Sequence, residues 1–236
     1  MKPLIRMIAL VVVAAFLATA TAPAVVRAQW KMTTFYLCLL VDGPNRNNPK
    51  GDVAEIQAAH FAHLKALMAN GKGVIAGPIA GSEGRLRGIL VLRAASLEEA
   101  RAVALADPAV KAGLFGIEIL GWYAADEIMK PVFNPADLTT YYFGFLKKGA
   151  AWTPEQTAAT KQLQAEHMAH LEASGKTGKL VIAGPISDSG DIRGILVYKT
   201  ASIDEAKAIA AADPAVKAGR LKVEMHTWLV SKGALP

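Results

Sequence analysis

The apolar and polar positions of the chain change period at intervals, and the first change predicts a strand followed by a helix. Residues 35–41 form a continuous apolar and aromatic run, which is typical of a strand. Residues 43–49 are rich in Gly, Pro and Asn and indicate a loop. Residues 52–70 predict a helix that ends at Gly71. The side chains of one helix face recur in it at three- and four-residue spacing: Ile56, His60, Leu64 and Leu67.

The next 50 residues predict two more strands, a second helix and a last strand. Residues 73–79 and 88–92 are short apolar runs typical of strands. Ser96 with Glu99 three positions later matches a capping box and predicts a helix that runs to Ala106. Residues 115–123 are again apolar and predict the last strand. The predicted order is strand, helix, strand, strand, helix, strand.

One heptapeptide, Asp-Pro-Ala-Val-Lys-Ala-Gly, occurs at residues 107–113 and again at 213–219. With these copies aligned, Arg87 falls on Arg193, and the apolar runs of the two halves also coincide. The chain is therefore a tandem duplication of one unit rather than a solenoid, which needs shorter and more numerous repeats.

The duplication predicts two units, residues 33–129 and 139–233, with a linker at 130–138 that contains two prolines. The order of elements in each unit is the split βαβ, or ferredoxin-like, plan of an α+β fold. This plan places both helices on one face of a four-stranded antiparallel sheet and leaves the other face apolar. We expect the two apolar faces to cover each other within the chain, so that a monomer forms an internal pseudo-dimer; higher assembly stays open.

Residues 1–28 predict a secretory signal peptide. Lys2 and Arg6 form a charged start, residues 8–20 are apolar or small, and residues 26–28 form a small-residue cleavage site, with 20–22 as a second option. An uncut membrane anchor is the alternative, but about 20 apolar residues are needed to span a bilayer. We expect an exported protein, periplasmic or extracellular, without a membrane attachment after cleavage.

The charge and the cysteine count add two expectations. The chain has 26 basic and 20 acidic residues, and three of the basic residues but no acidic residue lie in the leader. The mature chain shows no basic run with interleaved aromatic residues, so nucleic acid is not expected as a partner. The single cysteine, Cys38, lies in an apolar run and is expected to be a buried, inert thiol.

Five short motifs occur in the same order in both halves: His-Leu on the first helix, Ala-Gly-Pro, Gly-Ile-Leu-Val, Ser-x-x-Glu-Ala and Ala-Asp-Pro. In this order they resemble the YciI-like, or YCII-related, domains. The resemblance implies two ferredoxin-like units packed as an intramolecular dimeric α+β barrel, where relatives are usually homodimers of one unit. It also implies a His–Asp pair as an active site. At least one relative eliminates chloride from a chlorinated aromatic compound.

The resemblance places the candidate catalytic residues at His63 and Asp107 in the first unit and at His170 and Asp213 in the second. Two features depart from the relatives in both units. Ala109 and Ala215 follow Asp-Pro, where relatives commonly have an aromatic residue. Histidines occupy the positions three before the candidate bases, where relatives often have arginine: His60 and His167.

An imidazole beside a carboxylate is suited to general base catalysis, because the carboxylate fixes one ring nitrogen and raises the basicity of the other. Alternatives stay open at each position. Asp107 before Pro also suits a helix cap, and His63 also suits a buried helix position with a satisfied hydrogen bond. The candidate ligand-binding residues are His60, His167, Arg87 and Arg193, and for the arginines a solvated strand end is the alternative.

No metal and no cofactor is expected, since no third ligand stands at a recognisable spacing from either pair of histidines. Three functions remain open from the sequence. The first is a small enzyme with histidine bases that acts on a small organic molecule. The second is a small-molecule-binding protein without catalysis, and the third is a barrel subunit in which the His–Asp pairs only stabilise the fold.

Overall fold

The computed structural model describes residues 31–236 except 82–83 and 188–189, so the predicted leader lies outside the described residues. The first unit runs in the predicted order. Its elements are β1 (Met32–Asp42), α1 (Val53–Ala69), β2 (Gly73–Ala80), β3 (Leu86–Leu92), α2 (Leu97–Leu105), α3 (Pro108–Lys111) and β4 (Phe115–Ala125). The short helix α3 begins directly after Asp107, the residue that suits a helix cap.

The second unit repeats this order after a connecting segment. Its elements are β5 (Leu138–Lys148), α4 (Ala158–Lys176), β6 (Leu180–Pro185), β7 (Ile192–Tyr198), α5 (Ile203–Ala211), α6 (Pro214–Lys217) and β8 (Leu221–Ser231). Among the described residues, no helix has both the length and the apolar character that a membrane crossing requires.

The predicted capping boxes form in both units. Ser96 caps α2 by accepting a hydrogen bond from the Glu99 backbone N–H, while the Glu99 carboxylate accepts one from the backbone N–H of Ala95. Ser202 and Glu205 do the same at the start of α5. These reciprocal bonds satisfy backbone donors at the helix start and fix where each helix begins.

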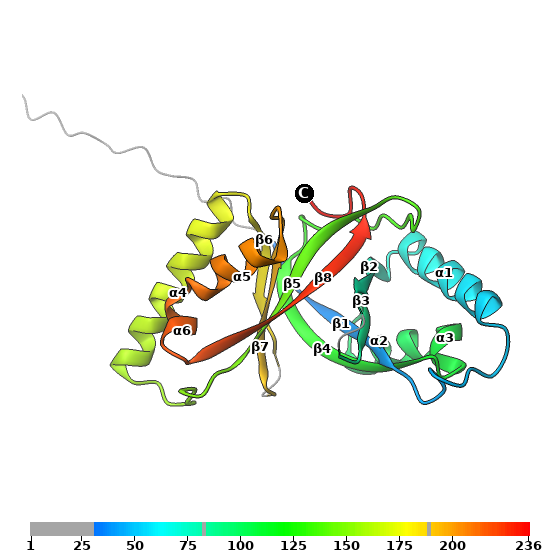
Figure 1. The fold of residues 1–236 in the computed structure, drawn as a ribbon, viewed down its shortest axis with the longest axis horizontal. Coiled ribbons are helices and arrows are strands. Elements are labelled where there is room, and N and C mark those ends of the chain that lie inside the picture. Colours follow the sequence, from blue (N-terminus) through cyan, green and yellow to red (C-terminus); the bar gives the residue numbers. More distant parts are fainter. Residues whose placement is uncertain (1–30, 82–83, 188–189) are drawn as a thin grey trace, which may run out of the picture.

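Two antiparallel sheets, one from each unit, join into one closed barrel. The strand order is β4-β1-β3-β2 in the first unit and continues through β8-β5-β7-β6 in the second. The two sheets meet edge to edge where β2 pairs with β8, and a bridge between Trp122 and Ile186 joins the remaining edges. The helices of each unit lie on the outside at opposite ends of the molecule (Figure 1). The predicted α+β fold, with two ferredoxin-like units as an intramolecular barrel, is confirmed.

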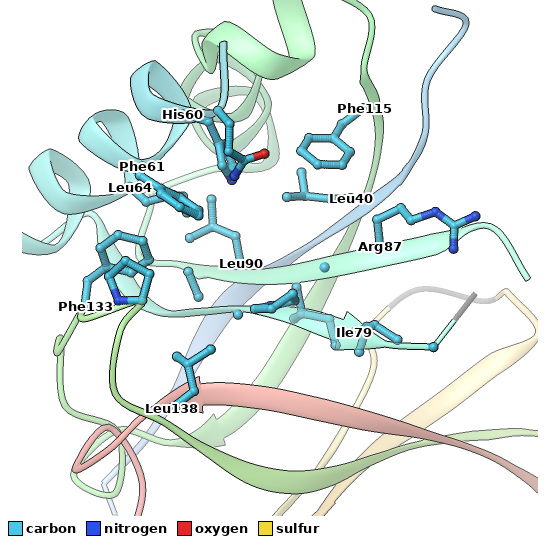
Figure 2. A pocket seen from close by; sticks show the side chains of 18 of the residues that line it. Leu40, His60, Phe61, Leu64, Ile79, Arg87, Leu90, Phe115, Phe133 and Leu138 are labelled. Atoms are coloured by element: carbon cyan, nitrogen blue, oxygen red, sulfur yellow. The ribbon is translucent and has the colours of Figure 1, made fainter. Parts of the chain in front are cut away.

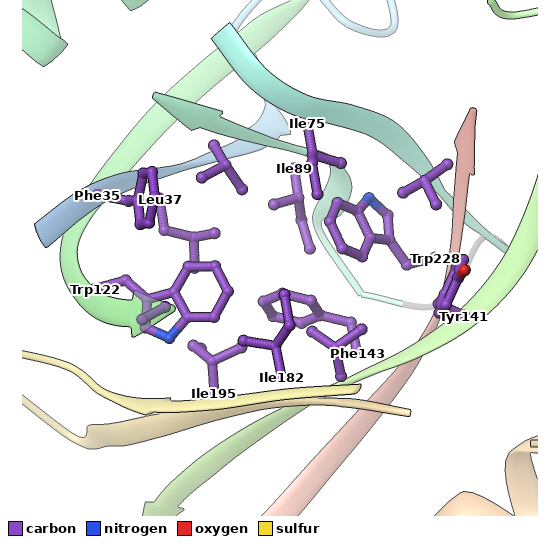
Figure 3. Close-up of a cluster of buried hydrophobic side chains, with 14 of the residues drawn as sticks. Phe35, Leu37, Ile75, Ile89, Trp122, Tyr141, Phe143, Ile182, Ile195 and Trp228 are labelled. Carbon is purple, nitrogen blue, oxygen red and sulfur yellow. The ribbon is translucent and has the colours of Figure 1, made fainter. Parts of the chain in front are cut away.

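The inside of the barrel is apolar and shared by both units (Figure 3). Trp122 and Trp228, from the last strand of each unit, point into it and are each 1% exposed. The barrel interior is therefore a packed core, and an open face for a ligand has to be sought on the outer side of the sheets, beneath the helices.

The connecting segment and the C-terminal segment are both bound to the barrel. The Tyr141 hydroxyl donates to the backbone oxygens of Leu235 at 3.1 Å and Pro236 at 2.7 Å, and Leu235 is buried in the shared core. The segment between β4 and β5 is held by the backbone N–H of Lys130, which donates to the Ala234 oxygen. Phe133 in this segment thereby lies over the helical side of the first unit.

Candidate functional site

The buried stripe of α1 carries a histidine. His60, Leu64, Leu67 and Met68 are the buried residues of this helix, at the spacing of a single helix face. Asp52 starts the helix by accepting a hydrogen bond from the Ala54 backbone N–H at 2.7 Å. The helix therefore presents the His60 ring to the outer face of the first sheet and not to solvent.

His60 is bound to Asp107. Its Nδ1–H donates to Asp107 Oδ2 over 2.7 Å, and the two residues are 5% and 2% exposed. The other carboxylate oxygen, Oδ1, accepts from the Ala109 backbone N–H at 2.8 Å and so caps α3. Asp107 is thus both a helix cap and the partner of a histidine, because each carboxylate oxygen takes one of the two donors.

The predicted pairing of Asp107 with His63 is wrong. The carboxylate binds the histidine one turn earlier: His60 belongs to the buried stripe of α1, whereas His63, three residues further on, is only half-buried. His63 Nε2 is buried and has no hydrogen-bond partner among the described residues. His63 also does not line the cavity described below.

The second unit repeats this geometry and this correction. His167 Nδ1–H donates to Asp213 Oδ2 at 2.6 Å, and Asp213 Oδ1 accepts from the Ala215 backbone N–H at 2.8 Å. His170, predicted as the partner of Asp213, has its Nε2 buried and, within the described chain, without a partner. The two halves therefore hold the same pair of residues in the same arrangement.

A cavity of about 480 Å³ opens beside His60 in the first unit (Figure 2). Its floor is the outer face of the sheet, with Leu40 and Leu90, and its roof is α1. Phe115 of β4 stands on one side, with its ring centroid 5.6 Å from that of His60. Phe133 of the connecting segment closes the opposite side and contacts Phe61 edge to face at 6.0 Å.

Two arginines line this cavity, whose other lining residues are mostly apolar. Arg87 is bound to Asp42 through two hydrogen bonds of 2.7 Å, from Nε to Oδ1 and from Nη2 to Oδ2. These bonds hold the pKa of Asp42 below its ordinary value. Arg46 reaches the same carboxylate only at 3.5 Å, and its guanidinium lies 5.5 Å from the centre of the Phe115 ring. The cavity thus has an imidazole on one wall and cationic groups on another.

The second unit differs at the position that corresponds to Arg46. Gly43 and Gly149 lie in equivalent turns, in which the Arg46 N–H donates to the Gly43 oxygen and the Trp152 N–H donates to the Gly149 oxygen. Trp152 therefore takes the place of Arg46, and Lys148 lies against its ring, with Nζ 4.3 Å from the centroid. The predicted ligand-binding residue Arg193, which aligns with Arg87, follows the first residue of β7. The two units thus share the His–Asp pair and the aligned arginines Arg87 and Arg193, but not Arg46.

The described residues contain no group of three or more His, Cys, Asp or Glu side chains that could hold a metal ion. Of His60 and His63, only His60 lines the cavity. The arrangement suits proton transfer, in which one carboxylate fixes one imidazole.

Comparison with known proteins agrees with the fold. The sequence model of the YCII-related domain matches residues 34–122 and 149–228, which together make up more than half of the chain. The chain belongs to the YCII-related domain family. No curated protein sequence matches it as a relative.

Solved structures with the same architecture come from distant sequences. A heme-binding protein from Thermus thermophilus matches with a TM-score of 0.53 and 11% identity, over 86% of this chain and 93% of that chain. A chlorite dismutase variant from Candidatus Nitrospira defluvii matches with a TM-score of 0.56 and 14% identity, over 84% and 91%. At such identities the likeness shows that this YCII-related chain shares their fold.

Three features of the site were missed in the sequence. The partner role of His60 had a signal, since the residue recurs with Leu64 and Leu67 in the apolar stripe of its helix. Arg46 had none, because it lies in a loop whose contact with Phe115 exists only after folding. Phe133 had none either, because nothing local shows that the connecting segment folds back over the first unit.

Proposed function

We propose that the first unit of this chain binds a small organic molecule in the cavity beside His60, and that His60 acts there as a general base. The single observation that carries this proposal is the 2.7 Å hydrogen bond between His60 and Asp107 at the wall of an apolar cavity of about 480 Å³. Cavities of roughly 300–1,000 Å³ with a few placed polar groups are typical of small-molecule sites.

The chemistry follows from the position of the proton on the ring. A carboxylate only accepts, so Nδ1 of His60 carries the hydrogen and the lone pair of Nε2 is left for a ligand in the cavity. Nε2 accepts a proton from an acidic C–H or O–H group of the ligand, and Asp107 stabilises the imidazolium that forms. Apolar walls such as Leu40 and Leu64 keep water away and strengthen this interaction.

The test needs a ligand first and then a proton-transfer readout. A library of small organic molecules is screened by thermal shift, and each hit is incubated with the protein in deuterium oxide. A general base that acts on a C–H group exchanges that proton for deuterium, which removes one signal from the proton NMR spectrum; O–H protons exchange without a catalyst and are not counted. We expect exchange with the wild type and with His167→Ala, the matched change in the second unit, and none with His60→Ala.

Asp107→Asn separates binding from catalysis. An asparagine retains the cap on α3 but can donate to Nδ1, which moves the ring hydrogen to Nε2 and removes the lone pair from the cavity. Ligand binding is then retained while exchange is lost. Undiminished exchange in this variant would exclude His60 as a base oriented by Asp107. Ligand binding without exchange in the wild type would leave a binding protein without catalysis.

A second candidate ligand is heme, which is favoured by the hydrogen bond between His60 and Asp107. Histidines that ligate a metal commonly donate from the other ring nitrogen to a carboxylate, as His60 does to Asp107, and the cavity walls are apolar. A protein of the same fold from Thermus thermophilus is a heme-binding protein. His60 would hold the iron through Nε2, and heme would supply redox chemistry there. A shift of the Soret band on addition of hemin, lost in His60→Ala, supports heme; a spectrum equal to that of free hemin excludes it.

We also propose that the protein acts after export, in the periplasm or outside the cell. The charged residues Lys2 and Arg6 and the apolar run at 8–20 support this proposal. The measurement is the mass of the mature protein from its source. A mass that corresponds to a chain beginning after residue 28 or after residue 22 supports export, and the mass of the chain with an intact N-terminus contradicts it.

A further inference from the structure

We propose that the cavity of the first unit selects a small organic anion, with a carboxylate held by Arg46 and an apolar body held against the sheet. This inference rests on the proposed small-molecule function and names the class of ligand that the site takes. It depends on charges and contacts at one end of the cavity, apart from the His60–Asp107 pair.

Among the described residues, the charges at this end do not cancel. Arg46 and Arg87 both line the cavity, and Asp42 is the carboxylate that both of them contact. Arg87 uses both carboxylate oxygens, at 2.7 Å each, so Asp42 neutralises this arginine first. Arg46, at 3.5 Å and beyond good hydrogen-bond geometry, keeps a positive charge at the cavity that Asp42 does not fully balance.

Arg46 is also held in place by an aromatic contact, and among the described residues only its Nε faces a carboxylate oxygen, Asp42 Oδ1 at 3.5 Å. Its guanidinium lies over the Phe115 ring, 5.5 Å from the centroid, and the His60 ring lies 5.6 Å from the same centroid. Phe115 therefore contacts both the cation and the base. A guanidinium whose N–H groups are available binds a carboxylate through two parallel hydrogen bonds, which a neutral ligand group cannot match.

The rest of the lining fixes the other end of the ligand. Away from the arginines the walls include four apolar residues: Leu40, Leu64, Leu90 and Phe133. These residues suit the apolar or aromatic part of a ligand. A molecule with one carboxylate and an apolar body satisfies both ends. Its acidic C–H or O–H group would lie between them, on the side of His60.

The second unit supplies a variant for testing this inference. Trp152 stands in the turn equivalent to that of Arg46, with the same backbone hydrogen bond, so tryptophan is compatible with this local backbone. Arg46→Trp and Arg46→Gln both remove the cation and leave His60 and Asp107 unchanged. Lys161→Gln, at an exposed position of α4, is the control for a general loss of positive charge.

The experiment is equilibrium binding, by thermal shift and calorimetry, with benzoate, 2-naphthoate and decanoate and their neutral amides as probes. We expect the acids to bind the wild type and Lys161→Gln, with weaker binding at high salt, and the amides to bind poorly. Arg46→Gln and Arg46→Trp should bind the acids roughly ten- to hundredfold more weakly, as expected for the loss of a charged hydrogen bond.

Three results would overturn the inference: equal binding of acids and amides, acid binding that survives both Arg46 variants, or no binding of any acid. None of these results tests the role of His60, which is measured separately by deuterium exchange on the ligands found by thermal shift. Conversely, the acids could bind in a way that depends on Arg46 without any proton exchange. That result would support the proposed ligand class and exclude His60 as a general base.

Discussion

Trp228 Nε1 donates a hydrogen bond to the backbone oxygen of Gly77 over 3.2 Å, and the two residues belong to different units. The bond lies where β2 meets β8 at the closure of the barrel. At this point the backbones approach so closely that a Cβ built on Gly77 would overlap the backbone oxygen of Leu229. Closure of the barrel therefore depends on a residue without a side chain.

Gly77→Ala is expected to destabilise the protein by about 1–3 kcal/mol, since the two strands have to move apart to admit a methyl group. The melting temperature should fall by several degrees. Gly175→Ala is the matched control, because Gly175 lies in α4 and the nearest atom to a built Cβ is 4.0 Å away. That variant should be neutral or up to about 1 kcal/mol more stable. Equal melting temperatures for the two variants would contradict the close approach of the strands.

Asp107→Ala is expected to cost about 2–4 kcal/mol in the free energy of unfolding. It removes the cap of α3, worth about 1 kcal/mol, and leaves the buried Nδ1–H of His60 without an acceptor, worth about 1–3 kcal/mol. Asp107→Asn retains both contacts and should cost much less. Urea unfolding of the two variants provides the measurement, and a similar loss in both would show that the charge, rather than the hydrogen bonds, stabilises this region.

Cys38 is expected to be inert to thiol reagents in the folded protein. Its side chain is fully buried, and burial, with a smaller effect of the Asp107 charge, raises the pKa of the thiol to about 12. The reactive thiolate is therefore scarce at about pH 8. Ellman's reagent should react with one thiol per chain in guanidinium and with almost none in buffer. Rapid reaction of the folded protein would show that β1 opens locally.

The contact between Asp42 and Arg87 predicts a dependence of stability on pH. The Arg87 hydrogen bonds lower the pKa of Asp42 in the folded protein. A depressed carboxyl pKa stabilises the fold above the unfolded value of about 3.9, and this stabilisation is lost as the pH falls through the folded pKa. Asp42→Asn should therefore melt below the wild type at about pH 7, and the difference should vanish in acid. A difference in melting temperature that persists in acid would show an effect of shape rather than charge. Asp137→Asn, at an exposed position, serves as the control for the loss of a carboxylate.

The sequence was sufficient for the fold because its signals are local and occur twice. The apolar runs, the capping box at Ser96 and the Asp-Pro at Asp107 each determine a short segment, and the repeat determines that a second copy exists. How the sheets join was less accessible. Facing apolar surfaces were expected, but the edge pairing of Ile79 with Trp228 joins residues that are far apart in the chain.

The candidate site could be predicted only in part, for a geometric reason. The sequence predicted Asp107 and a histidine on the first helix, but residues three apart lie close together on a helix, so spacing alone does not distinguish His60 from His63. Arg46 reaches the cavity from a loop, and Phe133 reaches it from the segment between the units. Neither position follows from a pattern along the chain, because both depend on how the complete barrel brings loops together.

The connection of the two units within one chain has an evolutionary consequence. In a homodimer each mutation changes two symmetric sites at once, so both sites must tolerate it. In this chain a mutation at Arg46 leaves Trp152 unchanged, although the two residues occupy equivalent turns. One half can therefore be refined by selection for its ligand while the other half is selected for stability alone, which is a freedom that identical subunits lack.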